Sequence, residues 1–476
     1  MQDNDYINLD IHLQNLLTPE QAWHYSIIPG EVNNGSLELF ISESKKNENI
    51  KEELEMLTGK KVSLISKPDT VIQQTLGRYY RRTRKSETIA NYSQTRSEDF
   101  IGDWIKEADS IGSSDIHVEA YEKKGRVRLR VDGKLVERYI IDKANYPSVI
   151  NKIKIMANLD IAEKRLPQDG RINFQSGSNR FDIRVSVLPT LHGEKVVLRL
   201  LSKDATSINL TNLGFSEDQL QQYITAIKKP HGIILISGPT GSGKTTTLYG
   251  TLKELNSENT NILTIEDPIE YTLPGINQVQ LKESIGLTFA SALRTFLRQD
   301  PDIIMLGEIR DQETAQMAIR AALTGHLVLS TIHTNSAWGT ISRLLDMDIP
   351  PFLLTETLNL AVAQRLVRLL CPSCKKEAPY HENMLPHVMK LPGKLTSHFV
   401  HEGCNECYYT GYKGRTAIYE LIPVDSKISG MIKSGVADPA EIYQVQHTRI
   451  LGESAFQLLK EGLTTIEEIY SILMNY

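Results

Sequence analysis

The chain has 476 residues, a formal net charge of −5, and a composition of 40% hydrophobic and 23% charged residues. This length predicts roughly three domains of about 100–200 residues each, and the composition is ordinary for a globular protein. The acidic balance excludes a protein that coats nucleic acid or anionic lipid through its overall charge, although local basic patches remain possible.

The first residues, "MQDNDYINLDIHLQNLL", lack the basic start and the apolar core of a signal peptide. Apolar runs such as "GIILI" are far shorter than the ~20 residues that a membrane span needs. We therefore expect a cytoplasmic protein, and any role at a membrane must come through partners.

Residues 1–80 are expected to form a small mixed α/β unit. "GSLELFIS" alternates polar and apolar residues, as a half-buried strand does, and "NIKEELEMLTG" has the features of a helix that ends at a glycine. Residues 81–98, "RRTRKSETIANYSQTRSE", are polar and basic without apolar periodicity. We expect them to be a linker.

Residues 99–204 are expected to form a smaller domain made mostly of strands. In "RVRLRV", which begins at Arg126, apolar residues alternate strictly with arginine, so the two kinds of side chain point to opposite faces. A solvated strand face is the default role of these arginines. For Arg184 and Arg199 in later strands, contact with a nucleotide across a domain or subunit boundary is the alternative, because a phosphoryl-transfer site usually needs a cation.

From residue 205 to residue 365, short apolar runs alternate with helical stretches. "GIILIS", "NILTIE", "DIIMLGE" and "LVLSTIH" are rich in β-branched residues and have the length of buried strands. This alternation predicts a parallel sheet covered by helices on both faces. The remaining residues are expected to form a four-cysteine zinc subdomain, 366–430, and C-terminal helices, 431–476.

A glycine-rich loop follows the first of these strands. "GPTGSGKT" matches the pattern GxxxxGK[ST] between a predicted strand and a predicted helix, which is the context that phosphate binding needs. In such a loop, backbone N–H groups converge on the phosphates of ATP, a lysine reaches the β- and γ-phosphates, and a threonine hydroxyl binds Mg²⁺. The candidate nucleotide-binding residues are Gly238, Pro239, Thr240, Gly241, Ser242, Gly243, Lys244, Thr245 and Thr246.

Acidic side chains follow two of the other strands. In "PDIIMLGEIRD", Glu308 comes two residues after the apolar run, where it could assist Mg²⁺, polarise the attacking water, or do both. In "LTIEDPIEY", Glu266, Asp267 and Glu270 cluster at the end of a strand. Ligands bind at the carboxyl ends of parallel strands, which favours a functional role over a solvated acidic turn.

Two histidines flank the strand "LVLSTI". His333 lies at its carboxyl end, on the same edge as the P-loop and the acids, and is a candidate sensor of the γ-phosphate or of a neighbouring subunit. His326 lies at the opposite end, so we do not expect the pair to share a metal. A packed structural imidazole is the alternative for His326.

The four cysteines form two CxxC pairs, Cys371 with Cys374 and Cys404 with Cys407. Paired CxxC motifs in a reducing compartment favour a metal over disulfides, and four sulfur ligands fit tetrahedral Zn²⁺ with every position filled. We expect a structural zinc site, because the segment between the pairs has too little apolar content for a core of its own. A redox dithiol is the alternative.

Together these segments resemble the secretion ATPases of type II secretion and type IV pilus systems. "SGPTGSGKTTTLY" resembles the family's Walker A motif, "TIEDPIEY" its aspartate box, "LRQDPDIIMLGEIRD" its Walker B motif and "TGHLVLSTIHTNSA" its histidine box. "SSDIHVE", "RLPQDGRI" and "FDIRVSVLPTLHGEKVVLRLL" resemble the domain that precedes the ATPase domain. The resemblance covers about residues 99–476, with the four boxes in family order.

The resemblance implies an α/β fold in which a PAS-like α+β domain precedes a RecA-like P-loop ATPase domain, with a small zinc-stapled subdomain towards the C-terminus. It also implies a homohexamer that holds ATP between the smaller domain and the ATPase domain. Glu308 matches the family's essential Walker B glutamate, and Glu266 and Glu270 match helpers from the aspartate box. Arg184 and Arg199 match the nucleotide-reaching arginines of the smaller domain. The arginines that match those around Walker B are Arg294, Arg298 and Arg310.

The resemblance further implies that ATP hydrolysis moves the smaller domain against inner-membrane platform and docking proteins, and so drives the assembly of a pilin-like filament. Retraction members usually lack the paired CxxC motifs and carry an "AIRNLIRE"-like segment, which is absent here, so assembly is favoured. Type II secretion is our leading interpretation, and type IV pilus extension is the alternative.

Two other classes of protein remain open. RecA-like sheets also drive nucleic-acid translocases, but the acidic net charge and the lack of aromatic residues beside "RVRLRV" count against direct binding of nucleic acid. A nucleotide-gated scaffold with little hydrolysis is the second class, and it would need fewer carboxylates at its strand ends.

Overall fold

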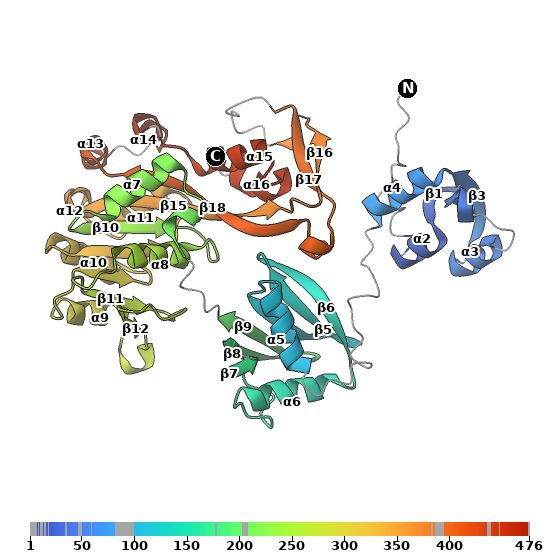
Figure 1. The fold of residues 1–476 in the computed structure, drawn as a ribbon, viewed down its shortest axis with the longest axis horizontal. Helices are drawn as coiled ribbons and strands as arrows, with labels where there is room; N and C mark the ends of the chain where they lie inside the picture. Colours follow the sequence, from blue (N-terminus) through green and yellow to red (C-terminus); the bar gives the residue numbers. More distant parts are fainter. Residues whose placement is uncertain are drawn as a thin grey trace. The chain divides into compact units, whose positions relative to one another are not determined.

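The computed structural model of this chain describes most of its residues (Figure 1). The described residues are 7, 9, 13, 16–17, 19–33, 36–45, 50–58, 60–80, 100–176, 179–201, 208–381, 384–385, 395–435, 439–446 and 448–474. The expected linker, residues 81–98, lies outside them. The chain separates into two compact units, one formed mainly by the first 96 residues and one that starts at Ser97.

The first unit is built on a three-stranded sheet in the order β1-β2-β3. β1 and β2 are antiparallel, whereas β2 and β3 are parallel, so the chain crosses over through α3 between them. Leu37, Leu39 and Ile41 of β2 are buried, as the alternating sequence predicts, and belong to one small core with the helices. The elements are α2 (Pro19–Tyr25), β1 (Ile27–Asn33), β2 (Ser36–Ser42), α3 (Ile50–Thr58), β3 (Lys61–Lys67) and α4 (Asp69–Tyr79).

The second unit contains a six-stranded sheet in the order β6-β5-β4-β9-β8-β7, apart from Arg138–Asp142 at the end of β6. Across the sheet, the neighbouring pairs β5-β4, β4-β9, β9-β8 and β8-β7 are all antiparallel. Ile116, Val118 and Leu129 are fully buried on one face, and α5 and α6 lie against β4 and β9. The elements are α5 (Phe100–Ser110), β4 (Asp115–Ala120), β5 (Lys124–Val131), β6 (Lys134–Asp142), α6 (Tyr146–Met156), β7 (Gln168–Ser176), β8 (Asn179–Thr190) and β9 (Gly193–Leu201).

The opposite face of this sheet carries paired charges. Glu119 on β4 accepts hydrogen bonds from Arg128 at 2.7 and 2.8 Å and from Arg126 at 3.0 Å. Arg130 pairs with Asp115 on the same strand β4 at 3.3 Å. The arginines of β5 are therefore ion-paired to acids of the neighbouring strand. The default expectation of a simply solvated arginine face is therefore wrong. The pattern of a single strand does not show which acids the neighbouring strand places beside it.

A second, seven-stranded sheet has the order β12-β11-β13-β14-β10-β15-β18. Its neighbouring strands are parallel, except that β18 runs antiparallel to β15. The four predicted apolar strands are β10, β11, β13 and β14, and every residue in them is buried. Helices α7 and α8 share a core with one face, and α9, α10 and α11 share a core with the other. The predicted parallel sheet with two covered faces is therefore confirmed.

Four helices of this region, α7, α9, α10 and α11, begin at a residue whose side chain caps the first turn. Ser216, Thr288, Asp311 and Ser336 each cap the start of a helix with a side-chain oxygen. The elements are α7 (Glu217–Ile227), β10 (Gly232–Ser237), α8 (Lys244–Leu255), β11 (Ile262–Glu266), β12 (Asn277–Gln280), α9 (Phe289–Phe296), β13 (Ile303–Leu306), α10 (Gln312–Leu323), β14 (Leu327–Ile332), α11 (Ala337–Asp346), α12 (Pro351–Thr357), β15 (Leu358–Leu370) and β18 (Tyr412–Pro423).

After residue 365 the chain stays with this sheet. β15 continues to Leu370, a two-stranded antiparallel sheet of β16 and β17 follows, and β18 then returns to the edge. The sheet thus extends through the range expected for the zinc subdomain, and α15 and α16 share its core. Among the described residues, no helix combines the length and the apolar character that crossing a bilayer requires. The elements are β16 (Lys375–Pro379), β17 (Ser397–His401), α13 (Ser426–Ser434), α14 (Pro439–Gln446), α15 (Leu451–Lys460) and α16 (Ile466–Leu473).

Candidate functional site

The P-loop connects β10 to α8 at the carboxyl end of the parallel sheet. Gly238, Gly241 and Gly243 have φ values of 148°, 79° and 87°, which residues with a side chain rarely adopt. A Cβ atom on Gly238 would also lie 2.5 Å from the carbonyl oxygen of Gln364. The loop path therefore depends on these glycines. The exposed members of the predicted set are Pro239, Thr240, Gly241, Thr245 and Thr246.

Lys244, the first residue of α8, turns its side chain back over the loop. Its Nζ atom donates hydrogen bonds to the carbonyl oxygens of Gly238 at 2.8 Å and of Pro239 at 3.1 Å. Burial lowers the pKa of the Lys244 ammonium, whereas the nearby Glu308 carboxylate raises it. The loop thus holds a buried ammonium at the helix start, next to the backbone N–H groups that favour an anion there.

Glu308 follows β13 and meets a residue from the next strand, as the parallel order predicts. Its Oε2 atom lies 3.2 Å from Nε2 of His333, which follows β14. Its Oε1 atom pairs with Arg310, and Arg310 also reaches Oδ2 of Asp267 at 3.3 Å. The Glu308 side chain is 16% exposed, so it is shielded from bulk water without being sealed from it. A carboxylate beside an imidazole in this position is suited to accept a proton from a water molecule.

Glu266 is the last residue of β11. Its side chain is buried and accepts hydrogen bonds from uncharged donors. Its Oε1 atom accepts hydrogen bonds from Thr264 Oγ1 at 2.6 Å and from Gln278 Nε2 at 3.0 Å. Its Oε2 atom accepts a hydrogen bond from the hydroxyl group of Tyr249, a residue of α8 whose pKa is raised by burial. The protein's own donors therefore satisfy Glu266, and this arrangement orients α8 against β11.

Arg184 on β8 contacts the segment after β11. Its Nη2 atom donates to the carbonyl oxygen of Ile269 at 2.6 Å, and its Nη1 atom lies 3.8 Å from Oε2 of Glu270. The Nε atom of Arg184 is buried without a hydrogen-bond partner. The structure therefore brings Arg184 and Glu270 together, although they lie far apart in the sequence.

Arg199 on β9 donates from Nε to Oδ1 of Asp115 at 2.9 Å, and this hydrogen bond raises the pKa of the arginine. Its side chain is still 58% exposed. Arg199 and Arg184 line one open cavity of about 500 Å³ on β7, β8 and β9, together with Asp169 and Arg171. The two arginines predicted to reach a nucleotide thus share one concave surface of the six-stranded sheet.

Two polar residues of β15 contact the P-loop region, although no motif singles them out. Gln364 donates from Nε2 to the carbonyl oxygen of Ser242 at 2.9 Å and accepts from Thr247 Oγ1 at 3.0 Å. Arg365 donates from Nη2 to the carbonyl oxygen of Asn335 at 2.8 Å, two residues beyond the histidine. In the sequence, these two residues appear only as a polar pair inside the apolar run "LNLAVAQRLVRLL". Such a pair indicates hydrogen-bond partners on other elements, because a buried strand tolerates polar residues only when they have partners.

His326 lies at the other end of β14, as expected. Its Nδ1 atom is 2.8 Å from the carbonyl oxygen of Ala321 and 3.2 Å from Oγ1 of Thr324, both at the end of α10. This imidazole caps a helix, which agrees with the structural alternative.

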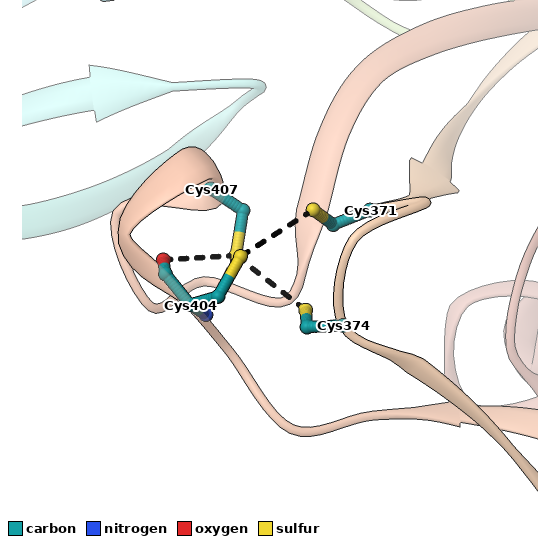
Figure 2. Close-up of side chains that lie close together, drawn as sticks. All are labelled: Cys371, Cys374, Cys404 and Cys407. Atoms are coloured by element: carbon teal, nitrogen blue, oxygen red, sulfur yellow. Dashed lines mark hydrogen bonds between the residues drawn. The ribbon is translucent and has the colours of Figure 1, made fainter.

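The four cysteines point toward one another from two turns of the chain (Figure 2). Their sulfur atoms all lie within 4.8 Å of one another, and the pairs Cys371–Cys404, Cys374–Cys407 and Cys404–Cys407 are each 3.8 Å apart. Four sulfurs bound to zinc at about 2.3 Å in a tetrahedron lie about 3.8 Å apart, whereas a disulfide needs about 2.05 Å. The spacing therefore fits a tetrahedral metal such as zinc and does not fit disulfides.

The surroundings of the cysteine cluster also suit a metal. Burial raises the pKa of the Cys374 thiol to about 12, so a thiolate there needs a cation beside it. The backbone N–H groups of Cys404 and Gly411 point at Sγ of Cys407 at 3.2 and 3.3 Å. Such donors around a metal-bound sulfur stabilise its negative charge.

The model of the family described as "Type II/IV secretion system protein" matches residues 91–471. The type IV pilus assembly ATPase PilB of Myxococcus xanthus is 45% identical over 449 residues, which cover 88% of this chain and 79% of that protein. The type II secretion system ATPase E of Vibrio cholerae is 46% identical over 375 residues, which cover 78% of this chain and 73% of that protein. The crystal structure of the pilus retraction motor PilT with bound ADP is similar, with a TM-score of 0.53 and 26% identity over 78% of this chain and 96% of that one. The chain therefore belongs to the type II/IV secretion system protein family, and it is a secretion-system ATPase.

Proposed function

We propose that this ATPase powers the assembly of a pseudopilus in type II protein secretion, by hydrolysing ATP at the edge of the seven-stranded sheet that carries the P-loop. One observation carries the proposal: Lys244, Glu308 and His333 follow the neighbouring strands β10, β13 and β14 at the same edge, and Glu308 lies 3.2 Å from His333 and acts electrostatically on Lys244. A purely nucleotide-gated scaffold would not need a shielded carboxylate beside an imidazole at this place.

The proposed reaction assigns one task to each group. The P-loop amides and Lys244 hold the β- and γ-phosphates, and the Thr245 hydroxyl is a ligand for Mg²⁺, which would neutralise phosphate charge when bound. Glu308 orients and deprotonates the attacking water, and His333 senses the γ-phosphate. Glu266 acts as a positioning residue, because its oxygens already accept hydrogen bonds from Thr264, Gln278 and Tyr249.

Arg184 and Arg199 are proposed to supply positive charge for the phosphoryl group. A cation at this point is worth ~10³–10⁵ in rate in enzymes where it has been measured. The shared cavity on the six-stranded sheet supports the assignment, and so does the exposure of Arg199. Glu270, which lies 3.8 Å from Arg184, would orient that arginine.

We further propose that Cys371, Cys374, Cys404 and Cys407 hold a structural Zn²⁺. In the proposed domain arrangement, residues 99–204 form the PAS-like domain, and residues 205–365 form the RecA-like ATPase domain. The zinc subdomain spans 366–430, and the helices of 431–476 close the core. Residues 1–80 dock a membrane partner, and residues 81–98 link them to the rest. The separate three-stranded, six-stranded and seven-stranded sheets support the division between residues 1–80, residues 99–204 and the rest of the chain.

The working form is proposed to be a homohexamer, cytoplasmic and peripheral at the inner membrane through platform and docking proteins. The names of the relatives support a secretion or pilus machine as the partner. Type IV pilus extension is the second candidate, because the match to the pilus assembly ATPase covers 88% of this chain, against 78% for the secretion ATPase.

Steady-state phosphate release from the purified protein tests the proposal, alone and with added single-stranded DNA or RNA. Specific activity that rises with protein concentration and does not respond to either strand is expected for a motor activated by assembly. Strong, saturable stimulation by a strand would instead indicate a nucleic-acid translocase. Deletion of the gene separates the two candidates: loss of protein secretion is expected, whereas loss of pili with normal secretion would favour pilus extension.

A further inference from the structure

Glu420 on β18 is a fully buried carboxylate that lies far from the nucleotide motifs in the sequence. Its exposed fraction is 0%. Its Oε1 atom accepts hydrogen bonds from the backbone N–H of Ala337 at 2.7 Å and from the Tyr443 hydroxyl at 2.9 Å. Its Oε2 atom accepts from the backbone N–H of Leu451 at 3.3 Å. A carboxylate in the core would be very costly without such donors, so these contacts are the condition for its presence there.

The two backbone donors come from the starts of two helices. Ala337 is the first residue of α11, and Leu451 is the first residue of α15. The first N–H groups of a helix have no partner within the helix, and the helix dipole favours negative charge at this end. Glu420 therefore connects the first turns of α11 and α15 by hydrogen bonds. It also binds α14 through the hydroxyl group of Tyr443.

The start of α11 is also tied to the catalytic edge. The carbonyl oxygen of Ser336 accepts hydrogen bonds from Thr334 Oγ1 at 3.1 Å and from Ser237 Oγ at 3.4 Å. Ser237 is the residue immediately before the P-loop. His333, three residues before Ser336, contacts Glu308 at 3.2 Å. The turn that carries the histidine is thus held between the P-loop strand on one side and Glu420 on the other.

We propose that Glu420 is a positioning residue for ATP hydrolysis: by fixing the first turn of α11 against α15, it sets His333 opposite Glu308. The proposal rests on the proposed role of that edge in hydrolysis. It makes the C-terminal helices part of the machinery that sets the rate. Displacement of a reacting group by about 1 Å can cost ~10²-fold in rate, so a small movement of this turn is sufficient for a large effect.

The substitution Glu420→Gln tests the proposal with almost no change in volume. The amide oxygen of glutamine can accept a hydrogen bond from the first N–H group of one helix. Its NH₂ group then faces the first N–H group of the other helix and cannot accept from it, so that helix loses its hydrogen bond to residue 420. We expect kcat to fall at least ~10-fold while the Kd for ATP stays within ~2-fold, because the P-loop is untouched. Hydrogen exchange of residues 333–340 is expected to rise.

Glu468→Gln is the matched control. Glu468 anchors α16 to β15 through Arg368, which donates from Nε at 2.9 Å, and it is 16% exposed. This control removes a carboxylate anchor of a C-terminal helix at a place away from α11. It is expected to lower thermal stability and to leave kcat and the exchange of residues 333–340 unchanged. A purely structural role for Glu420 would make the two variants behave alike.

Tyr443→Phe keeps the test decisive if Glu420→Gln does not fold. It removes one donor to Glu420 and leaves both helix starts in place, so a smaller fall in kcat, of ~2- to 5-fold, is expected. Unchanged kcat and unchanged exchange in the folded variants, or an equal fall in kcat in Glu468→Gln, would overturn the proposal. Wild-type protein and Glu308→Gln are measured alongside. Absence of turnover in the wild type would count against the proposed hydrolysis, and the exchange data would still decide whether Glu420 fixes the turn.

Discussion

Two carboxylates of the second unit, Glu119 on the six-stranded sheet and Glu308 at the edge of the seven-stranded sheet, have partners of different exposure. On the six-stranded sheet, Glu119 is 7% exposed and its partners Arg126 and Arg128 are 27% and 23% exposed. At the edge of the seven-stranded sheet, Glu308 has partners that are more open: Arg310 is 51% exposed and His333 is 54% exposed. The more buried partners of Glu119 are more restricted, whereas the exposed partners of Glu308 have room to move toward a substrate.

This difference separates charges that stabilise the fold from charges that are available for chemistry. Burial would raise the pKa of Glu119, but the hydrogen bonds from Arg128 and Arg126 outweigh it and hold the pKa at about 2. At the other sheet, burial lowers the pKa of Lys244, so this ammonium is held in place at some cost to the fold. A protein accepts such a cost where the group acts on a ligand.

The largest effect is expected from removing the Lys244 side chain, and it is an effect on ATP turnover. Lys244→Ala should lower ATP turnover by at least ~10²–10³-fold, because a preorganised positive group is lost from the phosphate site. Stability at neutral pH should hold or rise, since a buried ammonium is removed. Phosphate release and thermal unfolding measure the two effects. Lys253→Ala, near the end of the same helix, is the control, and normal turnover in Lys244→Ala would remove the assignment of the P-loop.

Removal of one cysteine is expected to act in the opposite direction, on stability more than on chemistry. Cys371→Ser should reduce bound zinc to near zero, because three remaining sulfurs hold the metal far less tightly, and it should loosen β16 and β17. Metal analysis and hydrogen exchange check this. The Kd for ATP should change little, because the P-loop is held by β10 and α8. A metal-free wild-type protein that is fully folded would contradict the zinc assignment.

The smallest effect is expected from Glu119→Gln, and it depends on pH. Glu119 has a pKa of about 2 in the folded protein against 4.5 for a free side chain, so its contribution to stability is complete above pH 4.5 and is lost as the pH falls toward 2. Glu119→Gln should lower the free energy of unfolding by ~1–3 kcal/mol at pH 7 and have a flatter pH dependence below 4.5. Denaturant unfolding at several pH values provides the measurement. Equal pH profiles for the two proteins would show that the ion pairs of this sheet do not stabilise it.

Local patterns predicted the features that depend on local physics. The apolar runs that became β10, β11, β13 and β14 are short and β-branched, and this pattern is sufficient for buried parallel strands. The positive φ values of the P-loop glycines follow from the motif itself. The proximity of His333 and Glu308 followed from their places at the carboxyl ends of strands in one sheet.

Features that depend on pairing between distant segments could not be predicted in this way. Nothing in "YKGRTAIYELIP" indicates that β18 returns to the sheet as an antiparallel edge strand, because the partner lies more than forty residues earlier. The roles of Gln364 and Glu420 come from donors on other elements, so each appears in the sequence only as a polar residue in an apolar strand. The ion pairs of the β5 arginines cannot be predicted from β5 alone, because their acids lie on the neighbouring strand β4.

The central claim is that the edge carrying the P-loop hydrolyses ATP and that Glu308 acts in the chemical step. The most direct test is to measure ATP binding and single-turnover hydrolysis in Glu308→Gln, with Glu313→Gln as the control, since Glu313 is 64% exposed on the following helix. We predict that Glu308→Gln binds ATP with nearly the wild-type Kd and hydrolyses it at least ~10²-fold more slowly, while the control is unchanged. Hydrolysis at the wild-type rate in Glu308→Gln, or a loss of binding equal to the loss of rate, would contradict the account.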